Sequence, residues 1–172
     1  MTGVHVVEAS TEDLRLAEIA IRWDVFVLEQ HVEPVLEIDA RDFRDDVVHL
    51  IALEDGTGRP LGVVRLIPDG ADHYHLGRLA VRAEARGTGA GAALVRALHD
   101  LVARRTAAGR DARIALDAQV HALGFYERQG YRAVPGEPFL DAGIWHRTMA
   151  RTVTGTADPA AGAPSSIEGT TA

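Results

Sequence analysis

A glycine-rich turn at residues 86–91, with the sequence Arg-Gly-Thr-Gly-Ala-Gly, limits the possible folds of this chain more than any other segment. It follows a strand-like run that ends at Val81, and it opens an amphipathic helical pattern. The start of a helix leaves backbone N–H groups without partners, and the helix dipole adds partial positive charge there. Arg86 places a full charge beside them. The turn therefore predicts a phosphate or pyrophosphate site, and with it a phosphate-bearing cofactor.

The rest of the chain alternates between β-branched runs and segments with helical spacing. Apolar residues from Leu14 to Leu28 recur every three or four positions, after a helix cap formed by Ser10 and Asp13. The predicted order is a strand at 4–7, a helix to residue 28, a loop at 31–46, strands at 47–53, 61–67 and 75–81, a helix from the glycine turn to Gly109, a strand at 114–117, a helix at 119–129, and strands at 131–134 and 143–149.

This order predicts one α/β (α+β) domain, a mixed sheet with helices on its faces. A length of 172 residues suits a single domain with a proper core. We place the domain at residues 1–151. Residues 152–172 consist mainly of Thr, Ala, Gly, Pro and Ser with little to bury, which predicts a disordered C-terminal tail.

Composition excludes several kinds of chemistry. The chain has no cysteine, so disulfides, thiolate metal sites and a cysteine nucleophile are excluded. All 18 basic residues are arginine, which excludes a Schiff-base lysine and a Walker-type nucleotide site. The net charge of −7 argues against nucleic-acid binding. We see neither a secretory signal nor a membrane-spanning run, so we expect a cytoplasmic protein with no membrane partner.

Two other interpretations of the glycine turn remain open. Gly87-x-Gly89-x-x-Ala92 also fits a loose dinucleotide-binding pattern, but that fold places the turn tight against its first strand. Here Arg82, Glu84 and Arg86 intervene, and three strands come earlier. The second alternative is a purely structural turn.

The placement of the turn after the fourth predicted strand resembles the GNAT (Gcn5-related) N-acetyltransferase superfamily. The family signature Gln/Arg-x-x-Gly-x-Gly/Ala is satisfied by Arg86-x-x-Gly89-x-Gly91. A second family motif, on the helix after the fifth strand, is matched by Phe125-Tyr126-Glu127 followed by Gly130-Tyr131. The segments Val25-Phe26-Val27-x-Glu29-Gln30 and Gly143-Ile144-x-His146 are similar to small bacterial members.

The resemblance implies a GNAT-type sheet, mostly antiparallel and splayed between its fourth and fifth strands. It also implies transfer of an acetyl group from acetyl-CoA to a primary amine of a small molecule, by direct attack in a ternary complex. No metal is expected, and homodimers are common in the family. The implied cofactor site comprises a strand edge for the pantetheine and the glycine turn for the pyrophosphate: Leu79, Ala80, Val81, Arg86, Gly87, Thr88, Gly89, Ala90, Gly91 and Ala92.

The family comparison also implies catalytic roles. Tyr126 is the predicted general acid for the departing thiolate, because a phenol is protonated at neutral pH. Glu37 is the predicted general base, and Glu29, Asp39 and His146 are predicted to contact the acceptor. Other candidates for the base are Asp42, His49, His75 and His121. His73 and His75 lie on one face of a strand, but no third metal ligand has a recognisable spacing.

Three functional alternatives remain. Arg22, Phe26, Glu37, Asp39, Asp42 and Arg65 fall in an order similar to acyl-homoserine-lactone synthases, which share the fold. Those enzymes commonly lack the complete glycine turn that this chain has. A non-catalytic acyl-CoA-binding module would retain the same turn. An enzyme that acetylates proteins would differ only in its acceptor.

Overall fold

A computed structural model of the chain describes residues 3–157. The elements are β1 (Val4–Glu8), α1 (Glu12–Arg22), the π-helix η1 (Trp23–Glu29), α2 (Pro34–Glu37), the 3₁₀-helix η2 (Ala40–Phe43), β2 (Val48–Glu54), β3 (Pro60–Pro68), β4 (His73–Val81), the 3₁₀-helix η3 (Ala83–Ala85), α3 (Ala90–Arg105), β5 (Asp111–Gln119), the 3₁₀-helix η4 (Val120–Ala122), α4 (Leu123–Arg128), β6 (Arg132–Ala133), β7 (Phe139–Asp141) and β8 (Ile144–Thr154).

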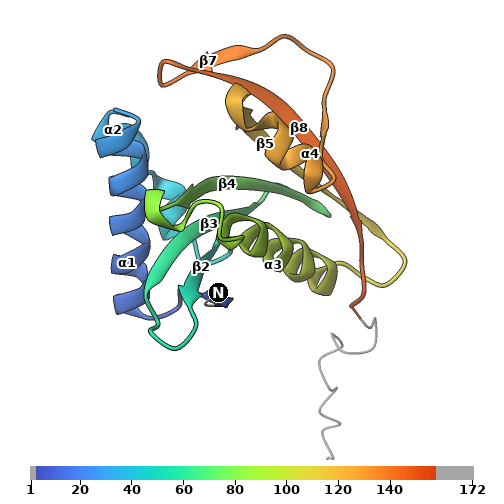
Figure 1. Cartoon of the computed structure of the whole chain (residues 1–172). Helices are drawn as coiled ribbons and strands as arrows, with labels where there is room; N and C mark the ends of the chain where they lie inside the picture. The colour runs from blue at the N-terminus through green and yellow to red at the C-terminus, as the bar shows by residue number, and fades with distance from the viewer. Residues whose placement is uncertain (1–2, 158–172) are drawn as a thin grey trace, which may run out of the picture.

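The strands form one mixed sheet in the order β1-β2-β3-β4-β5-β8-β6, with β7 paired to β8 (Figure 1). Every pairing is antiparallel except that of β4 with β5. α3 connects these two parallel strands, as a parallel crossover requires. The predicted mixed, mostly antiparallel sheet is therefore confirmed.

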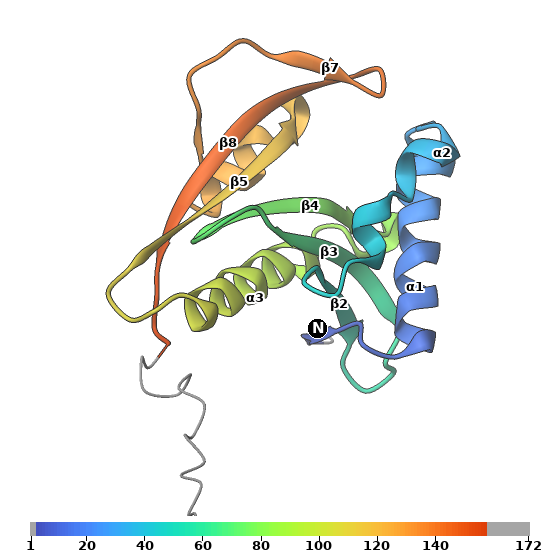
Figure 2. The ribbon, with the colours of Figure 1, turned by 180° about the vertical axis from the view of Figure 1, so that it is seen from behind.

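β4 and β5 are paired over a short stretch and then separate. Their register contains three pairs and ends where His75 lies beside Ala115. Beyond this point the two strands diverge, as Figure 2 shows from behind. The sheet is thus split into a half made by β1–β4 and a half made by β5–β8.

Two hydrophobic cores cover the two faces of the first half. On one face, α3 packs Leu94, Leu98 and Val102 against β2, β3 and β4. On the other face, Ile21 and Val25 pack against Ile51, Val63 and Ala80. These helical residues recur at spacings of four, which gives each helix one buried stripe.

β4 contains a bulge at Arg78. Val63 pairs with Ala80 and Arg65 pairs with Gly77, so two residues of β4 lie opposite one residue of β3. Arg78 takes a left-handed backbone conformation, with φ of +53°. A bulge shifts which residues point to each face, so Leu76 faces α3 before it and Ala80 faces α1 after it.

The first helix differs from its prediction in two respects. Thr11, rather than Ser10, caps α1 by accepting a hydrogen bond from the Leu14 amide. The helix then widens into η1, where the Gln30 amide donates to the Val25 carbonyl five residues earlier. The wider turn takes Leu28 off the buried face, and 60% of that residue is exposed.

Two segments after the first helix also differ. The predicted loop at 31–46 contains α2 and η2. β7 was missed, because three exposed residues give little periodicity.

At the C-terminal end, the predicted domain boundary at residue 151 lies inside β8, because Thr152, Val153 and Thr154 pair with the start of β5. The rest of the predicted tail, from residue 158, lies outside the described residues. Between residues 3 and 157, no helix combines the length and apolarity needed to span a membrane.

The core of α3 leads to a stability prediction. Leu98 is fully buried, whereas Leu16 on α1 is 58% exposed. Leu98→Ala is expected to lower the unfolding free energy by about 2–5 kcal/mol, because it leaves a cavity. Urea unfolding measures the effect, with Leu16→Ala as the matched helical control. Equal losses in the two variants would contradict the described packing of α3.

Candidate active site

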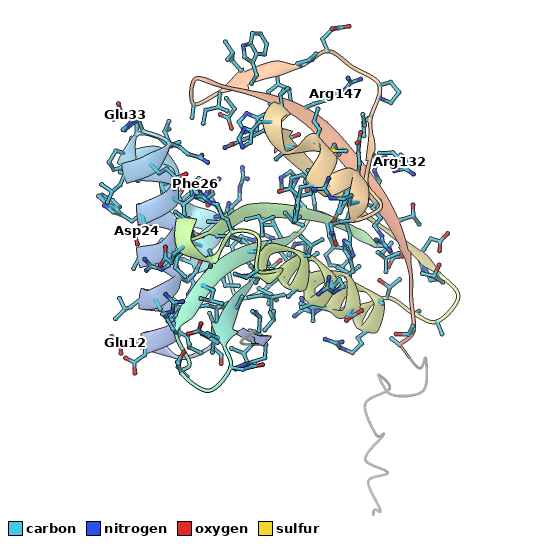
Figure 3. The ribbon with its side chains drawn as sticks, in the orientation of Figure 1. Glu12, Asp24, Phe26, Glu33, Arg132 and Arg147 are labelled. Atoms are coloured by element: carbon cyan, nitrogen blue, oxygen red, sulfur yellow. The ribbon has the colours of Figure 1, made fainter. Side chains whose placement is uncertain are left out.

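A cleft of about 1130 Å³ opens where β4 and β5 separate. η1 and α2 border one side of it, and η4 and α4 border the other. Phe26, labelled in Figure 3, lies on the cleft side of η1, while Glu12 lies on the outer side of α1. The predicted site residues that line this cleft are Glu29, Glu37, Asp39, Leu79, Ala80, Val81, Arg86, Gly87, Gly89, Ala90, Gly91, Ala92, Tyr126 and His146.

Thr88 is the one residue of the predicted site that does not line the cleft. Its hydroxyl donates to the Ala85 carbonyl at 2.7 Å. Thr88 therefore bonds to the turn itself.

The glycine turn presents free N–H groups to the cleft. Gly87 and Gly89 have φ values of +79° and +94°, which strongly favour glycine. Gly89 caps α3, and the first helical bond runs from the Ala93 amide to the Gly89 carbonyl. The amides of Ala90, Gly91 and Ala92 precede that bond, and no side chain caps them. This end of α3 has the geometry that binds anions.

The charge of Arg86 is already paired. Its two Nη atoms donate to the two carboxylate oxygens of Glu29 at 2.7 Å each, and its Nε donates to the Val81 carbonyl at 3.1 Å. Hydrogen bonding to Arg86 lowers the pKa of Glu29. Arg86 and Glu29 thus form one neutral unit across the cleft mouth, which their separation in sequence did not predict.

Tyr126 is held by an aromatic cluster beneath the cleft. Its ring makes edge contacts with Phe125 at 5.1 Å and with Tyr131 at 5.8 Å between centroids. Burial, with a smaller effect of Arg151, lowers the pKa of His99 to about 4, and its Nε2 lies in hydrogen-bond distance of the Tyr131 hydroxyl, at 2.9 Å. Burial also raises the pKa of Tyr126, which keeps its hydroxyl protonated at neutral pH.

The wall opposite Tyr126 rests on a buried ionic network. Arg22 lies at its centre and bonds Glu18, Glu37 and Asp42, with N–O distances of 2.5–3.0 Å. The network joins four guanidinium groups to four carboxylates, so their formal charges sum to zero. Its members are Arg15, Arg22, Arg65, Arg78, Glu18, Glu37, Asp39 and Asp42.

Glu37 lies within this network and only its edge reaches the cleft. It is 3% exposed, and Oε1 accepts from Arg22 Nε at 2.5 Å. Oε2 lies 3.2 Å from Arg78 Nε. Burial raises the pKa of Glu37, against the opposing effects of Arg22 and Arg78. Both of its oxygens thus contact guanidinium groups.

Asp42 and His49 lie behind the cleft wall, and neither lines it. His49 Nδ1 lies 2.8 Å from Glu18, while its buried Nε2 has no partner within residues 3–157. Glu18, Asp42 and His49 bring potential ligand atoms within 4.8 Å of one another. Arg22 Nη1, however, bonds both carboxylates, so a cation already occupies this cluster.

Three histidines predicted as candidates do line the cleft: His75, His121 and His146. His146 stacks on Phe139 with centroids 6.0 Å apart, and its Nδ1 lies 2.8 Å from the Ile144 carbonyl. Asp39 also lines the cleft, and both of its oxygens accept from Arg65 at 3.0–3.1 Å.

Two features of the cleft were missed in the sequence. Gln119 Nε2 donates to Gln30 Oε1 at 2.8 Å, so an amide pair joins the two halves of the sheet. Arg78 donates to the carbonyls of Leu36 and Glu37 and so ties α2 to β4. These partners lie 41–89 residues apart, and no local pattern indicates them.

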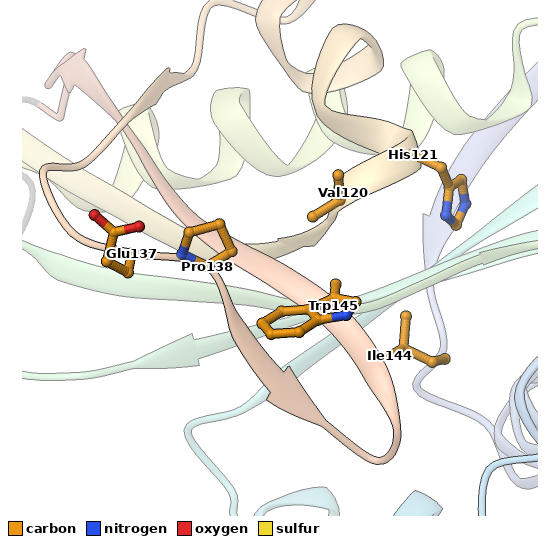
Figure 4. Close-up of a pocket in the computed structure, with 6 residues that line it drawn as sticks. All are labelled: Val120, His121, Glu137, Pro138, Ile144 and Trp145. Carbon is orange, nitrogen blue, oxygen red and sulfur yellow. The ribbon is translucent and has the colours of Figure 1, made fainter.

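A second hollow of about 710 Å³ lies beside the β7–β8 hairpin (Figure 4). Trp145 and Pro138 form part of its lining together with Val120 of η4. His121 and Ile144 line both this hollow and the main cleft. The apolar hollow therefore borders the far end of the cleft.

The network around Arg22 leads to a prediction. Arg22→Met is expected to lower the unfolding free energy by about 3–5 kcal/mol, because buried carboxylates lose their partner. The difference in unfolding free energy between Arg22→Met and the wild type is expected to shrink as the pH falls toward 4, since protonation neutralises the buried carboxylates that have lost their partner. Urea unfolding between pH 4 and 8 measures this. Arg44→Met, which breaks the exposed pair with Asp46, is the control and should leave stability nearly unchanged. A pH-independent deficit for Arg22→Met would contradict the role of charge.

Comparison with known proteins identifies the family. The model described as "Acetyltransferase (GNAT) domain" matches residues 11–153. The Bacillus subtilis (strain 168) protein named "Uncharacterized N-acetyltransferase YjcF" is 34% identical over 145 residues, which cover 84% of this chain and 96% of that protein. The crystal structure of an acyl-CoA N-acyltransferase from Pseudomonas aeruginosa is 29% identical with a TM-score of 0.70, and the match covers 88% of this chain and 99% of that one.

A second similar structure is the CoA-dependent acyl-homoserine lactone synthase BjaI with SAM and isopentyl-CoA. It is 20% identical with a TM-score of 0.67, and the match covers 89% of this chain and 84% of that one. At this identity the similarity shows the fold alone. The family match and the YjcF relative reach further: the chain belongs to the GNAT family and is an acyl-CoA-dependent N-acetyltransferase.

Proposed function

We propose that this enzyme transfers an acetyl group from acetyl-CoA to a primary amine of a small molecule, by direct attack in a ternary complex. The observation that carries the proposal is the uncapped start of α3 at the mouth of the cleft. Two left-handed glycines and three free amides lie there. A diphosphate fits this site, because the free amides can donate to its oxygens and no side chain competes with it as a cap. Glycine at positions 87 and 89 allows the left-handed backbone that the turn requires.

The edge of β4 beyond His75 supports the second part of the cofactor site. The register with β5 has ended, and Leu79, Ala80 and Val81 line the cleft. An extended pantetheine arm can bond to such a strand edge as an added strand does. In this proposal, backbone amides of β4 also polarise the thioester carbonyl and stabilise the oxyanion that forms on it.

In this proposal, Tyr126 protonates the thiolate of CoA as the C–S bond breaks. Burial raises the pKa of its phenol, so the proton is present at neutral pH. Within residues 3–157 the Tyr126 hydroxyl has no hydrogen-bond partner, and the side chain lines the cleft. The hydroxyl is therefore available to a bound thioester.

Glu37 remains a prediction as the general base, and the geometry favours a different role for it. Its two oxygens already contact Arg22 and Arg78. We infer that Glu37 positions the side of the cleft made by α2, because it holds these two guanidinium groups.

One observation favours an alternative acyl acceptor. Arg22, Glu37, Asp39, Asp42 and Arg65, which resemble acyl-homoserine-lactone synthases in their order, converge on one network. BjaI, which shares the fold, was solved with SAM and isopentyl-CoA. Lactone formation from isopentyl-CoA and SAM, without acetylation of amines, would support this alternative. The intact glycine turn supports a CoA donor under either alternative.

The central experiment measures acetyl-CoA binding by calorimetry and thiol release against a panel of amines, amino acids, aminosugars and peptides. Binding with amine-dependent thiol release supports the proposal. Binding without turnover of any acceptor indicates an acyl-CoA-binding module. Absence of binding overturns the cofactor assignment.

Arg86 provides a test of the cofactor site. Arg86→Glu is expected to weaken acetyl-CoA binding about tenfold or more, which is about 1.4 kcal/mol, because two carboxylates would then lie beside the diphosphate. Calorimetry measures the dissociation constant. Arg82→Glu is the matched control, because Arg82 also pairs with a carboxylate of η1, Asp24, but does not line the cleft. Unchanged affinity in Arg86→Glu would contradict a diphosphate at the turn.

Tyr126 provides a test of the chemical step. Tyr126→Phe is expected to lower kcat about 100-fold while acetyl-CoA affinity stays within about twofold, because only the proton donor is lost. Steady-state thiol release and calorimetry separate the two effects. Tyr131→Phe is the control, since Tyr131 is also buried but its hydroxyl bonds to His99. Full activity in Tyr126→Phe would remove this residue from the mechanism.

A further inference from the structure

An alkyl ammonium must lose a proton before its nitrogen can attack a thioester. With Glu37 engaged by two guanidinium groups, the cleft must offer another proton acceptor near the acetyl group. The acetyl group would lie where the pantetheine arm ends, close to the point at which β4 and β5 separate. A proton acceptor is therefore expected at that point, on the face of the sheet that carries Arg65, the partner of Asp39.

His75 occupies this position. It is the last residue of β4 that pairs with β5, and it lines the cleft. It pairs with Ile67 of β3, two residues after the Arg65–Gly77 pair, so it lies on the same face as Arg65. No hydrogen bond within residues 3–157 engages its ring. Burial lowers the pKa of His75, which leaves the imidazole neutral and able to accept a proton at pH 7.

Asp117 lies diagonally across the separation from His75. His75 lies beside Ala115 on β5, and Asp117 follows two residues later on the same face. Asp117 is exposed, lines the cleft, and accepts from the Thr148 hydroxyl at 2.8 Å on one oxygen. Its negative charge favours the protonated form of the His75 ring more than any other neighbouring group does. No guanidinium within residues 3–157 pairs with this carboxylate, in contrast to those of Glu37 and Asp39.

The other charges around His75 come from three elements. Asp69 in the β3–β4 turn also favours the protonated ring, whereas Arg41 of η2 and Arg65 of β3 disfavour it. Arg65 is tied to Asp39 and Asp42. Among these groups, only Asp117 lies on β5, the opposite side of the separation.

We propose that His75 and Asp117 form the amine-receiving pair of this enzyme: Asp117 binds the acceptor as an alkyl ammonium, and His75 takes its proton. The inference rests on the proposed function. It assigns the acceptor to amines that are cationic at neutral pH and whose charged nitrogen reaches the point where β4 and β5 separate. Acceptors that are already neutral would not need this pair.

An imidazole nitrogen of His75 takes a proton from the ammonium, and the freed nitrogen attacks the thioester carbonyl. The C–S bond breaks, an amide forms, and the thiolate takes the phenolic proton of Tyr126. The second N–H proton of the attacking nitrogen leaves to solvent, and its loss makes the amide neutral. The imidazolium loses its proton to solvent, and the phenolate takes one back.

The test uses the full chain, acetyl-CoA, and putrescine, tyramine, 2-phenylethylamine and glycine amide as probes. His75→Gln should lower kcat about 100-fold and remove the acidic limb of the pH–rate profile, while acetyl-CoA affinity stays within about twofold. In the wild type, that limb should inflect below the ordinary histidine value of about 6.5. Asp117→Asn should raise the KM for the amine about tenfold and move the limb to lower pH, because the attraction on the His75 proton is lost.

His73→Gln is the matched control. His73 lies on the same strand and face but is exposed and outside the cleft lining. The variant His73→Gln should leave kcat, the KM for the amine, the acidic limb and the acetyl-CoA affinity unchanged. Methoxyamine, which is neutral at pH 7, should react equally with wild type and His75→Gln. Should His75→Gln fail to fold, NMR titration of the His75 ring in wild type and Asp117→Asn gives the same comparison of pKa values.

Different results would contradict the proposed function and the amine-receiving pair. Absence of acetyl-CoA binding by the wild type would overturn the proposed function. Turnover of neutral methoxyamine together with no turnover of the cationic probe amines would overturn the amine-receiving pair alone. Full activity of His75→Gln, or an acidic limb that persists in it, would also overturn the pair. If Glu37→Gln instead removed the acidic limb at unchanged stability, Glu37 would be the base.

Discussion

β4 and β5 share three register pairs and then separate, so the edge of β4 beyond His75 faces a cleft instead of a neighbouring strand. A strand edge without a neighbour normally invites association with another chain. Here it lies inside the molecule, between η1 and α2 on one side and η4 and α4 on the other. The glycine turn follows this edge after the short η3, so the free strand edge and the free start of α3 both line the same cleft.

The two sides of the cleft are built differently. The side that holds Tyr126 is an aromatic cluster with one internal hydrogen bond, between Tyr131 and His99. The opposite side is an ionic network in which Arg22 is almost fully buried. Such a network is strongly directional, because each guanidinium requires its carboxylates in one plane. The short elements α2 and η2, which could not fold by propensity alone, obtain their positions from it.

The sequence predicted the parts of the molecule that local pattern encodes. The glycine turn, the helix it opens and the order of the long strands all follow from spacing within a few residues. The network could not be found this way, because Arg22 and Glu37 lie 15 residues apart and Arg22 and Asp42 lie 20 apart. The pairing of Arg86 with Glu29, 57 residues apart, was missed for the same reason. The widening at η1 was missed because its residues are compatible with an ordinary helix.

The neutrality of the Arg22 network also restricts how the chain can diverge. Loss of a buried guanidinium leaves buried carboxylates without a counter-charge, and loss of a carboxylate leaves a buried guanidinium without one. Replacements in this cluster are therefore tolerated when a cation and an anion change together. Related proteins that bind other acceptors should accordingly keep the whole set or exchange it in opposite-sign couples, while residues on the cleft surface vary one at a time.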